Sequence, residues 1–169
     1  GKTVPEDWHL QQVTLIYKKG DPADCNNYIP SCLLAAAYKI FAMILLKRLL
    51  DAGADERLWP TQFGFRRRRG TDDALHCVRR AVELTWSQRG ASLHLMALDS
   101  RKVFDFISPT PLLQSLRRFG TPAPFTALLA PIYGVRTVHV RECGQTCGMH
   151  SQHSCICQGC PLSFFLLII

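Results

Sequence analysis

Apolar and polar positions follow two different periods along this chain, and the two periods predict strands and helices. Three short runs rich in β-branched or apolar residues predict strands, at residues 13–17, 93–98 and 136–141. Four longer segments carry apolar residues at helical spacing and predict helices, at residues 33–50, 71–88, 108–120 and 125–133. A partner for the last strand is expected near residues 155–158. This order of elements predicts an α+β fold.

The strand at residues 93–98 is the most informative element. It is almost continuously apolar, which is typical of a central strand covered on both faces, and it runs directly into Asp99. A second carboxylate follows at Asp105. A carboxylate at the end of a buried strand is costly unless it is paired, and a metal ion, a basic side chain or a helix N-terminus could pair with it. The unremarkable alternative is a contact with a neighbour, Arg101 or Lys102.

Basic residues gather at two turns. Lys18 and Lys19 follow the first strand, and a second turn is expected at residues 26–30. Arg66 to Arg69 form the densest positive charge and lead into the helix that begins at Thr71. Guanidinium groups beside free helical N–H donors make an anion site for which phosphate is the usual ligand. A solvated loop without a ligand is the alternative reading of both basic groups.

The overall charge agrees with a polyanionic partner. The 169 residues include 20 basic and 13 acidic ones, giving a formal net charge of +7. This excess favours nucleic acid first and an anionic membrane surface second. Hydrophobic residues make up 47% of the chain, so general disorder is not expected.

The sequence indicates a nuclear or cytoplasmic protein that is not secreted. Its first residues contain no apolar signal core, so the eight cysteines are expected to be reduced thiols. The most apolar run, residues 33–46, contains a lysine and is too short to cross a bilayer comfortably, and no membrane partner is expected. The final run, residues 162–169, is apolar with no polar cap, which suggests a fragment whose next elements are missing.

Four blocks in order resemble the reverse transcriptase domain of non-LTR (LINE-like) retrotransposons. They span nearly the whole chain, and together they are far more specific than any one of them. The blocks are Lys18-Lys19-Gly20-Asp21 with Asn27-Tyr28-Ile29-Pro30, Gln62-Phe63-Gly64-Phe65-Arg66 with Arg69, Thr71 and Asp73, Leu98-Asp99 to Phe104-Asp105, and Gln158-Gly159-Cys160-Pro161-Leu162-Ser163.

The resemblance implies a right-hand polymerase, with fingers at residues 1–90 and the first part of a palm at residues 91–169. Its expected partners are an RNA template, a DNA primer and a dNTP. The implied reaction is a two-metal transfer in which the primer 3′-hydroxyl attacks the dNTP and pyrophosphate leaves. Asp99 matches the first catalytic aspartate, and Mg²⁺ suits it because this ion prefers hard oxygen ligands. Asp105 is expected to be structural.

The resemblance also implies roles for other residues. Phe104 matches the aromatic steric gate that crowds a ribose 2′-hydroxyl, with an ordinary core position as the alternative. The remaining implied residues fall into a dNTP-binding group and a nucleic-acid-binding group. The first group is Arg66, Arg69, Gln158 and Gly159, and the second is Lys18, Lys19, Arg67 and Arg68.

Several positions depart from the family pattern. Arg68 stands where a glycine is usual, so its turn is expected to be strained. Ile29, Val103 and Phe164 replace the usual Arg, Ala and Pro. The second metal motif, an aromatic-x-Asp-Asp hairpin, would come after Ile169. Because one aspartate cannot hold two metals, the chain alone is expected not to polymerise.

Two readings from other classes remain open. Residues 143–160 contain Cys143, Cys147, His150, His153, Cys155, Cys157 and Cys160. Zinc needs four such ligands, but this segment lacks a pair of well-spaced Cys-x-x-Cys knuckles, so a zinc module is the weaker alternative. A non-catalytic nucleic-acid-binding relic would use the same positive charge and remains the other alternative.

Overall fold

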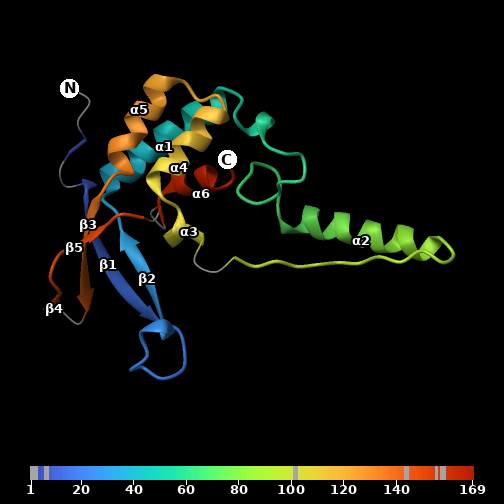
Figure 1. Ribbon diagram of the computed structural model, residues 1–169, viewed down its shortest axis with the longest axis horizontal. Coiled ribbons are helices and arrows are strands. Elements are labelled where there is room, and N and C mark those ends of the chain that lie inside the picture. The colour runs from blue at the N-terminus through green and yellow to red at the C-terminus, as the bar shows by residue number, and fades with distance from the viewer. Residues whose placement is uncertain (1–3, 6–7, 101–102, 143–144, 155, 157–158) are drawn as a thin grey trace.

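A five-stranded mixed sheet lies at one end of the molecule. The computed structural model describes residues 4–5, 8–100, 103–142, 145–154, 156 and 159–169. Strands β1 (Leu10–Tyr17), β2 (Tyr28–Leu33), β3 (Arg136–Glu142) and β4 (Gln145–Thr146) lie in the order β2-β1-β3-β4, and β5 (His150–Gln152) also pairs with β3. β1 is antiparallel to β2 and parallel to β3, so distant parts of the chain meet in one sheet (Figure 1).

Strand β2 corrects one prediction from the sequence. Residues 26–30 were expected to form a turn, but only the short helix η2 (Cys25–Asn27) turns there. Tyr28 pairs with Tyr17, and Pro30 pairs with Leu15. Pro30 is tolerated because β2 has a neighbour on one side only among the described strands, so its missing N–H breaks no second ladder. The partner of β3 is likewise nearer than expected, at residues 145–152; of the expected segment, positions 155, 157 and 158 lie outside the described residues.

Four helices pack together beside the sheet. They are α1 (Ala36–Asp51), α4 (Pro109–Arg118), α5 (Ala123–Ile132) and α6 (Pro161–Leu167). Leu45, Leu116, Leu129 and Leu162 are fully buried in their shared core. Helix α1 begins at Ala36 rather than at residue 33, because Leu33 is taken up by β2. α4 and α5 match the predicted helices, and Pro131 lies inside α5 without ending it.

Helix α6 was not predicted. The final apolar run was expected to be exposed, but Leu162, Phe165 and Leu166 are buried and α6 packs against α1. The helix begins directly after Cys160 with Pro161 in its first turn, where the missing proline N–H breaks no helical bond. The run therefore supplies core contacts. None of the described helices is both long and apolar enough to span a lipid bilayer.

An arm projects from this body. It consists of α2 (Thr71–Ser87) and an extended segment, residues 91–98, which returns along the helix after the turn at Gly90 (Figure 1). The predicted helix is confirmed. The predicted central strand is wrong as a buried strand, because residues 91–100 are exposed and residues 92–98 make no backbone hydrogen bond within the described part of the chain. Their apolar character favours extended backbone, but strand pairing needs a neighbour that the described residues do not supply.

Candidate functional site

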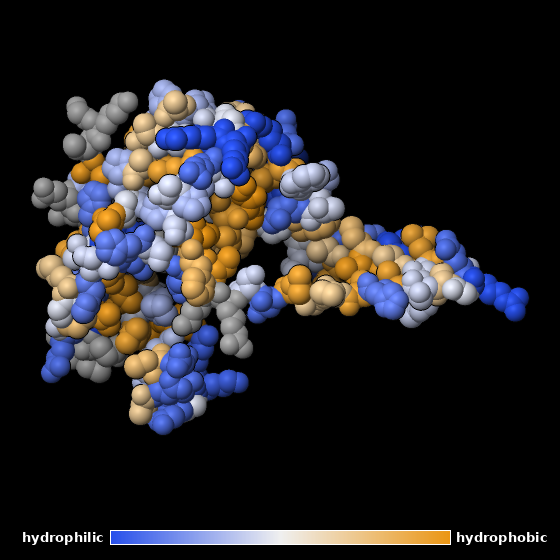
Figure 2. All heavy atoms as spheres, in the orientation of Figure 1, coloured by the Kyte–Doolittle hydropathy of each residue, from blue (hydrophilic) through white to orange (hydrophobic). Residues whose placement is uncertain are grey.

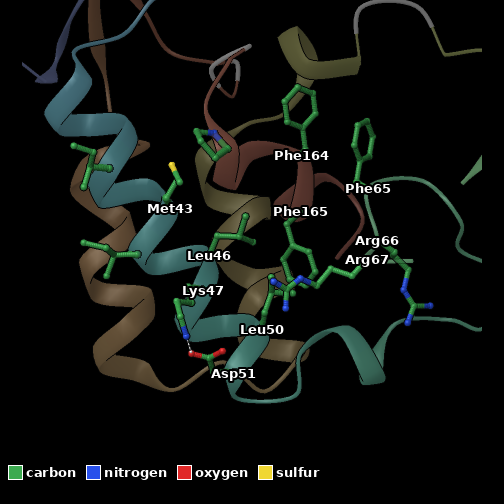
Figure 3. A pocket seen from close by; sticks show the side chains of 13 residues that line it. Met43, Leu46, Lys47, Leu50, Asp51, Phe65, Arg66, Arg67, Phe164 and Phe165 are labelled. Carbon is green, nitrogen blue, oxygen red and sulfur yellow. Dashed lines mark hydrogen bonds and ion pairs between the residues drawn. The ribbon is translucent and has the colours of Figure 1, made fainter. Parts of the chain in front are cut away.

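An aromatic cluster joins the second and third sequence blocks to Phe164, the residue that directly follows the fourth block. The short helix α3 (Val103–Phe106) carries Phe104, whose ring meets Phe164 of α6 edge-on with a centroid distance of 5.5 Å. Phe65 stacks on Phe164 with a centroid distance of 4.9 Å (Figure 3). Phe164, the residue that departs from the family pattern, therefore lies between the second and third blocks. Such pairs contribute about 0.5–1.5 kcal/mol each beyond their area burial.

The first block approaches the third at Asp105 of α3. Asp105 lines a second hollow together with Lys18, Asn26, Tyr28 and Ile29 of the β1–β2 hairpin. Neither basic residue at the hairpin tip is buried: Lys18 and Lys19 are both exposed. The first block thus approaches Asp105 directly, and the second block and the end of the fourth approach Phe104 through Phe164, although the blocks lie far apart in the sequence.

An apolar groove lies beside the aromatic cluster. Its volume is about 710 Å³, and α1, residues 65–67 and α6 form its walls. Ile40, Met43 and Ile44 of α1 are exposed on its apolar side. Lys47 and Asp51 form an ion pair at one end, and Arg67 also lines the groove (Figure 3). The apolar atoms of this face are visible between the body and the arm in Figure 2.

Arg66 is the best-held arginine of the predicted anion site. Its Nε donates to Asp55 Oδ1 at 3.2 Å, and its Nη2 donates to Asp55 Oδ2 at 3.0 Å and to the Asp55 carbonyl at 2.6 Å. Its Nη1 donates to the carbonyls of Trp59 and Gln62 at 3.0 and 3.5 Å. A guanidinium has five N–H donors, so these five bonds use all of them. In this conformation Arg66 holds together the loop from Asp55 to Arg66 and has no donor left for a phosphate.

The other three arginines divide into two kinds. Arg69 donates to the carbonyl of Pro60 and lies 5.8 Å from the centroid of the Phe63 ring, which places it over that aromatic face. Arg67 and Arg68 are exposed, and neither side chain has a hydrogen bond or ion pair to the described residues. At the N-terminus of α2, the Asp73 carboxylate accepts from the Gly70 N–H at 2.8 Å and adds a negative charge that disfavours a phosphate there. Arg67 and Arg68 therefore remain the available cations.

The strain expected at Arg68 is present. Arg68 has φ +56°, in the left-handed region that disfavours a Cβ, and Phe65 in the same loop has φ +58°. Replacing Arg68 with Gly is expected to raise the free energy of unfolding by about 0.5–1 kcal/mol, because relief of this strain exceeds the entropy lost by glycine. Urea denaturation measures the change. Arg67→Gly is the control, since it removes the same charge where φ is not positive, and an equal or lower stability of Arg68→Gly would contradict the prediction.

Asp99 lies at the base of the arm and is exposed. Its carboxylate makes no hydrogen bond or ion pair with the residues that the structure describes, and the neighbours proposed as its alternative partners, Arg101 and Lys102, lie outside them. No three His, Cys, Asp or Glu residues of the described chain form a metal-ligating group. Asp99 therefore offers one open carboxylate and not a two-metal site.

The fourth block contributes a turn. Gly159 has φ +89°, in the left-handed region, so this position needs glycine for its backbone conformation. A Cβ there would lie 3.9 Å from the Cys32 carbonyl oxygen, which is ordinary contact. The positive φ at Gly159, and not a lack of room for a Cβ, explains why this position is glycine. Gln158, its predicted partner in nucleotide binding, lies outside the described residues.

The cysteine- and histidine-rich segment does not assemble within the described residues. Cys160 is buried, and its thiol accepts from the Tyr38 hydroxyl at 3.6 Å. Cys147 is exposed, and its thiol accepts from the Val140 N–H and donates to the Gly148 carbonyl. The described members thus make separate structural contacts; Cys143, Cys155 and Cys157 lie outside the described residues.

One thiol lies near α3. Burial raises the pKa of the Cys32 thiol, the positive charge of Arg136 opposes this rise, and the negative charge of Asp105 adds to it. Cys32, Arg136 and Asp105 are therefore close enough to sense one another's charge. Arg136 is itself buried in β3.

Sequence reasoning missed Phe65, Phe164 and Tyr28 as members of the site. The second and third blocks each carry aromatic residues and Phe164 directly follows the fourth, and that shared feature was the available signal. Nothing local indicates that these aromatics touch, because Phe65 and Phe164 lie 99 residues apart in the sequence and Phe104 and Phe164 lie 60 apart. Their contacts depend on the packing of α6.

Comparison with known proteins assigns the class. Residues 16–169 match the family model described as reverse transcriptase (RNA-dependent DNA polymerase), which includes all four blocks. The chain therefore belongs to the reverse transcriptase family.

The similar curated proteins are mobile-element polyproteins. The chain is 30% identical over 169 residues, 96% of its length, to the Retrovirus-related Pol polyprotein from type-1 retrotransposable element R2 of Popillia japonica, covering 22% of that protein. It is 31% identical over 80% of its length to the RNA-directed DNA polymerase from mobile element jockey of Drosophila melanogaster, covering 15% of it. The chain is thus a reverse transcriptase domain sequence of a LINE-like element, and it spans less than a quarter of these relatives.

Proposed function

We propose that this chain supplies the fingers and the first part of the palm of an RNA-directed DNA polymerase. The observation that supports this most directly is the approach of the first block to Asp105, and of the second block and the end of the fourth to Phe104 through Phe164. The proposed division, fingers at residues 1–90 and palm at residues 91–169, falls in the arm at Gly90. Both parts contribute to one sheet and one helical core, so the two would form a single body.

Asp99 is proposed as a ligand of Mg²⁺. Its open, exposed carboxylate suits an ion that keeps most of its waters and takes one or two protein carboxylates. When bound by a complete polymerase site, two such ions activate the primer hydroxyl and stabilise the leaving pyrophosphate. The described residues provide a single ligand for this purpose, so the remaining carboxylates would come from the downstream palm of the same polyprotein.

The proposed substrates are an RNA template, a DNA primer and a dNTP. Arg67 and Arg68, which are exposed and unpaired among the described residues, would contact phosphates, together with Lys18 and Lys19 at the hairpin tip. Arg69 and Gly159 would lie nearer the nucleotide. Phe104 is proposed as the sugar gate, because its ring packs against Phe164, which itself stacks on Phe65, and a gate must be rigid to exclude a hydroxyl.

Primer extension on an RNA template with Mg²⁺ tests the proposal. The isolated chain is expected to extend no primer, whereas the chain joined to its downstream palm and thumb is expected to extend with dNTPs. Phe104→Val in the longer polypeptide should raise ribonucleotide incorporation relative to deoxynucleotide incorporation. Primer extension by the isolated chain would refute its expected inactivity. A longer polypeptide whose RNA affinity falls steeply with salt concentration, but which never extends a primer, would favour the non-catalytic alternative.

A further inference from the structure

We infer that Phe65 and Phe164 are positioning residues that set the sugar selectivity of the proposed polymerase by acting through Phe104. Their effect depends on the proposed role of Phe104 as the sugar gate. Neither ring needs to touch the nucleotide, because a gate excludes a 2′-hydroxyl only if its own ring cannot move aside. The side chains that hold the Phe104 ring therefore decide how strictly it excludes a ribonucleotide.

Phe164 supports the Phe104 ring from one side. The two rings meet edge-on, with a centroid distance of 5.5 Å and an interplanar angle of 84°. Phe164 also lines the apolar groove of about 710 Å³, whereas Phe104 is not part of its lining (Figure 3). A smaller side chain at position 164 would therefore open space between the Phe104 ring and the groove. Such space is refilled only in part by the surrounding structure, so the ring would have room to turn away.

The backbone of Phe104 is held by a different contact. Ile156, which is 1% exposed, donates its N–H to the Phe104 carbonyl at 3.0 Å. A backbone hydrogen bond leaves the side chain free to choose among its rotamers, so the position of the ring depends on its packing. Ile156 thus fixes helix α3, and Phe164 fixes the ring that α3 carries. A substitution at position 164 is expected to loosen the ring and leave the backbone bond in place.

Phe65 holds Phe164 from the second sequence block. Their rings are stacked, with a centroid distance of 4.9 Å and an interplanar angle of 26°. Phe65 has φ +58°, a conformation that persists in a residue with a Cβ only where its surroundings enforce it. The next residue, Arg66, supplies that constraint through its five hydrogen bonds within the loop from Asp55 to Arg66. The braced loop therefore sets the direction of the Phe65 ring.

The three rings connect the proposed fingers to the proposed palm. Phe65 lies in the first part, and Phe104 and Phe164 lie in the second. The conformation of the loop that carries Phe65 is thus coupled to the gate. Proline is usual at the position of Phe164, so this ring contact comes from a residue in which the chain departs from the family pattern. Ordinary core packing is the alternative, and it predicts a loss of stability without a change in sugar selectivity.

The preference for dATP over ATP opposite a template uridine tests the inference. It is measured as the ratio of the two kcat/KM values, in a polypeptide that carries this chain with its downstream palm and thumb. Phe164→Leu removes the ring but keeps an apolar side chain, and it is expected to lower the preference about fivefold. Phe65→Leu should lower it about twofold, since Phe65 acts one contact further away. Phe164→Tyr keeps the ring and should stay within about twofold of the parent.

Phe165→Leu is the matched control. Phe165 is the next residue of α6, is 3% exposed and also lines the groove, and its ring contacts no other aromatic ring of the described residues. Its substitution should lower the urea midpoint at least as much as Phe164→Leu does, because a more buried ring is lost. The preference for dATP should stay within about twofold of the parent. An equal loss of preference in both variants would mean that general loosening of the core is the cause, and the inference would be wrong.

Phe104→Val separates the positioning role from the gate itself. Phe104→Val should lower the preference more than Phe164→Leu does, and the double variant F104V/F164L should lower it no further, because Phe164 acts through the ring that is already missing. A loss of preference in Phe104→Val with none in Phe164→Leu would overturn the positioning role and leave the gate standing. No loss in Phe104→Val would refute the gate and every action through it.

Urea denaturation of the isolated chain tests the ring contact without any polymerase activity. The midpoint shifts of Phe104→Val and Phe164→Leu are compared with that of the double variant. The double variant should shift less than the sum of the two, because both single variants lose the same contact between the rings. Shifts that add would show that the Phe164 ring does not support the Phe104 ring, and they would overturn the inference even if the longer polypeptide extended no primer.

Discussion

Asp99→Asn, made in a polypeptide that carries this chain with its downstream palm, is expected to lower the rate of primer extension by about 10³-fold or more. Asparagine has nearly the same shape but no charge, and it is a much weaker Mg²⁺ ligand than a carboxylate. A catalytic metal contributes several kcal/mol of transition-state stabilisation, and each 1.36 kcal/mol corresponds to about tenfold in rate. Single-turnover extension with saturating dNTP and Mg²⁺ measures the chemical step directly.

Asp72→Asn is the matched control for this substitution. Asp72 is an exposed aspartate in the first turn of α2, and the Gly70 N–H is held by Asp73 instead. Its loss should change the extension rate less than about threefold, because surface substitutions away from a site have small effects. An Asp99→Asn variant that keeps more than a tenth of the parent rate would remove Asp99 from the catalytic centre.

Local sequence patterns predicted most of the helices but not their contacts. α2, α4 and α5 follow from apolar spacing and from turn residues at their ends, such as Ser108 before Pro109. Strands are harder to predict from local sequence, because strand pairing depends on two segments that can lie far apart in the sequence. Tyr28 to Leu33 contain turn-forming residues, yet β1 recruits them into β2. Residues 93–98 have the apolar pattern of a buried strand, yet no described segment pairs with them.

The sequence predicts several residues of the candidate site, but it does not predict how they are arranged in space. Asp99 and Phe104 were selected from the sequence, and Phe104 lies where the blocks converge. Phe164 looked like a departure, but it became the centre of the aromatic cluster because α6 places it between Phe65 and Phe104. Charge density likewise predicted an anion site at Arg66, and it could not predict that Asp55, eleven residues earlier, would bind the guanidinium. The Asp55 carboxylate and the loop carbonyls compete with any phosphate for the donors of Arg66.

The contacts of Arg66 lead to the second large effect, which is on stability. Arg66→Met is expected to lower the free energy of unfolding by about 3 kcal/mol. The Arg66 side chain is 6% exposed and its partner Asp55 is 26% exposed, so removal leaves a partly buried carboxylate unpaired and takes one donor from each of three backbone carbonyls. Arg66→Lys should lose about 2 kcal/mol, since one ammonium cannot reproduce the planar fork. Urea denaturation measures both, and Arg67→Met, at an exposed position, should change stability by less than about 0.5 kcal/mol.

The same variants distinguish two roles for Arg66 in the complete polymerase. If it only closes the loop from Asp55 to Phe65, an Arg66→Lys enzyme assayed well below its melting temperature should keep its KM for dNTP within about twofold. A direct bond to the triphosphate would instead raise that KM by about tenfold or more, because a charge-assisted hydrogen bond contributes about 1.5–3 kcal/mol. The five occupied donors predict the first outcome. A large rise in KM with unchanged stability would mean that the guanidinium leaves Asp55 when the nucleotide binds.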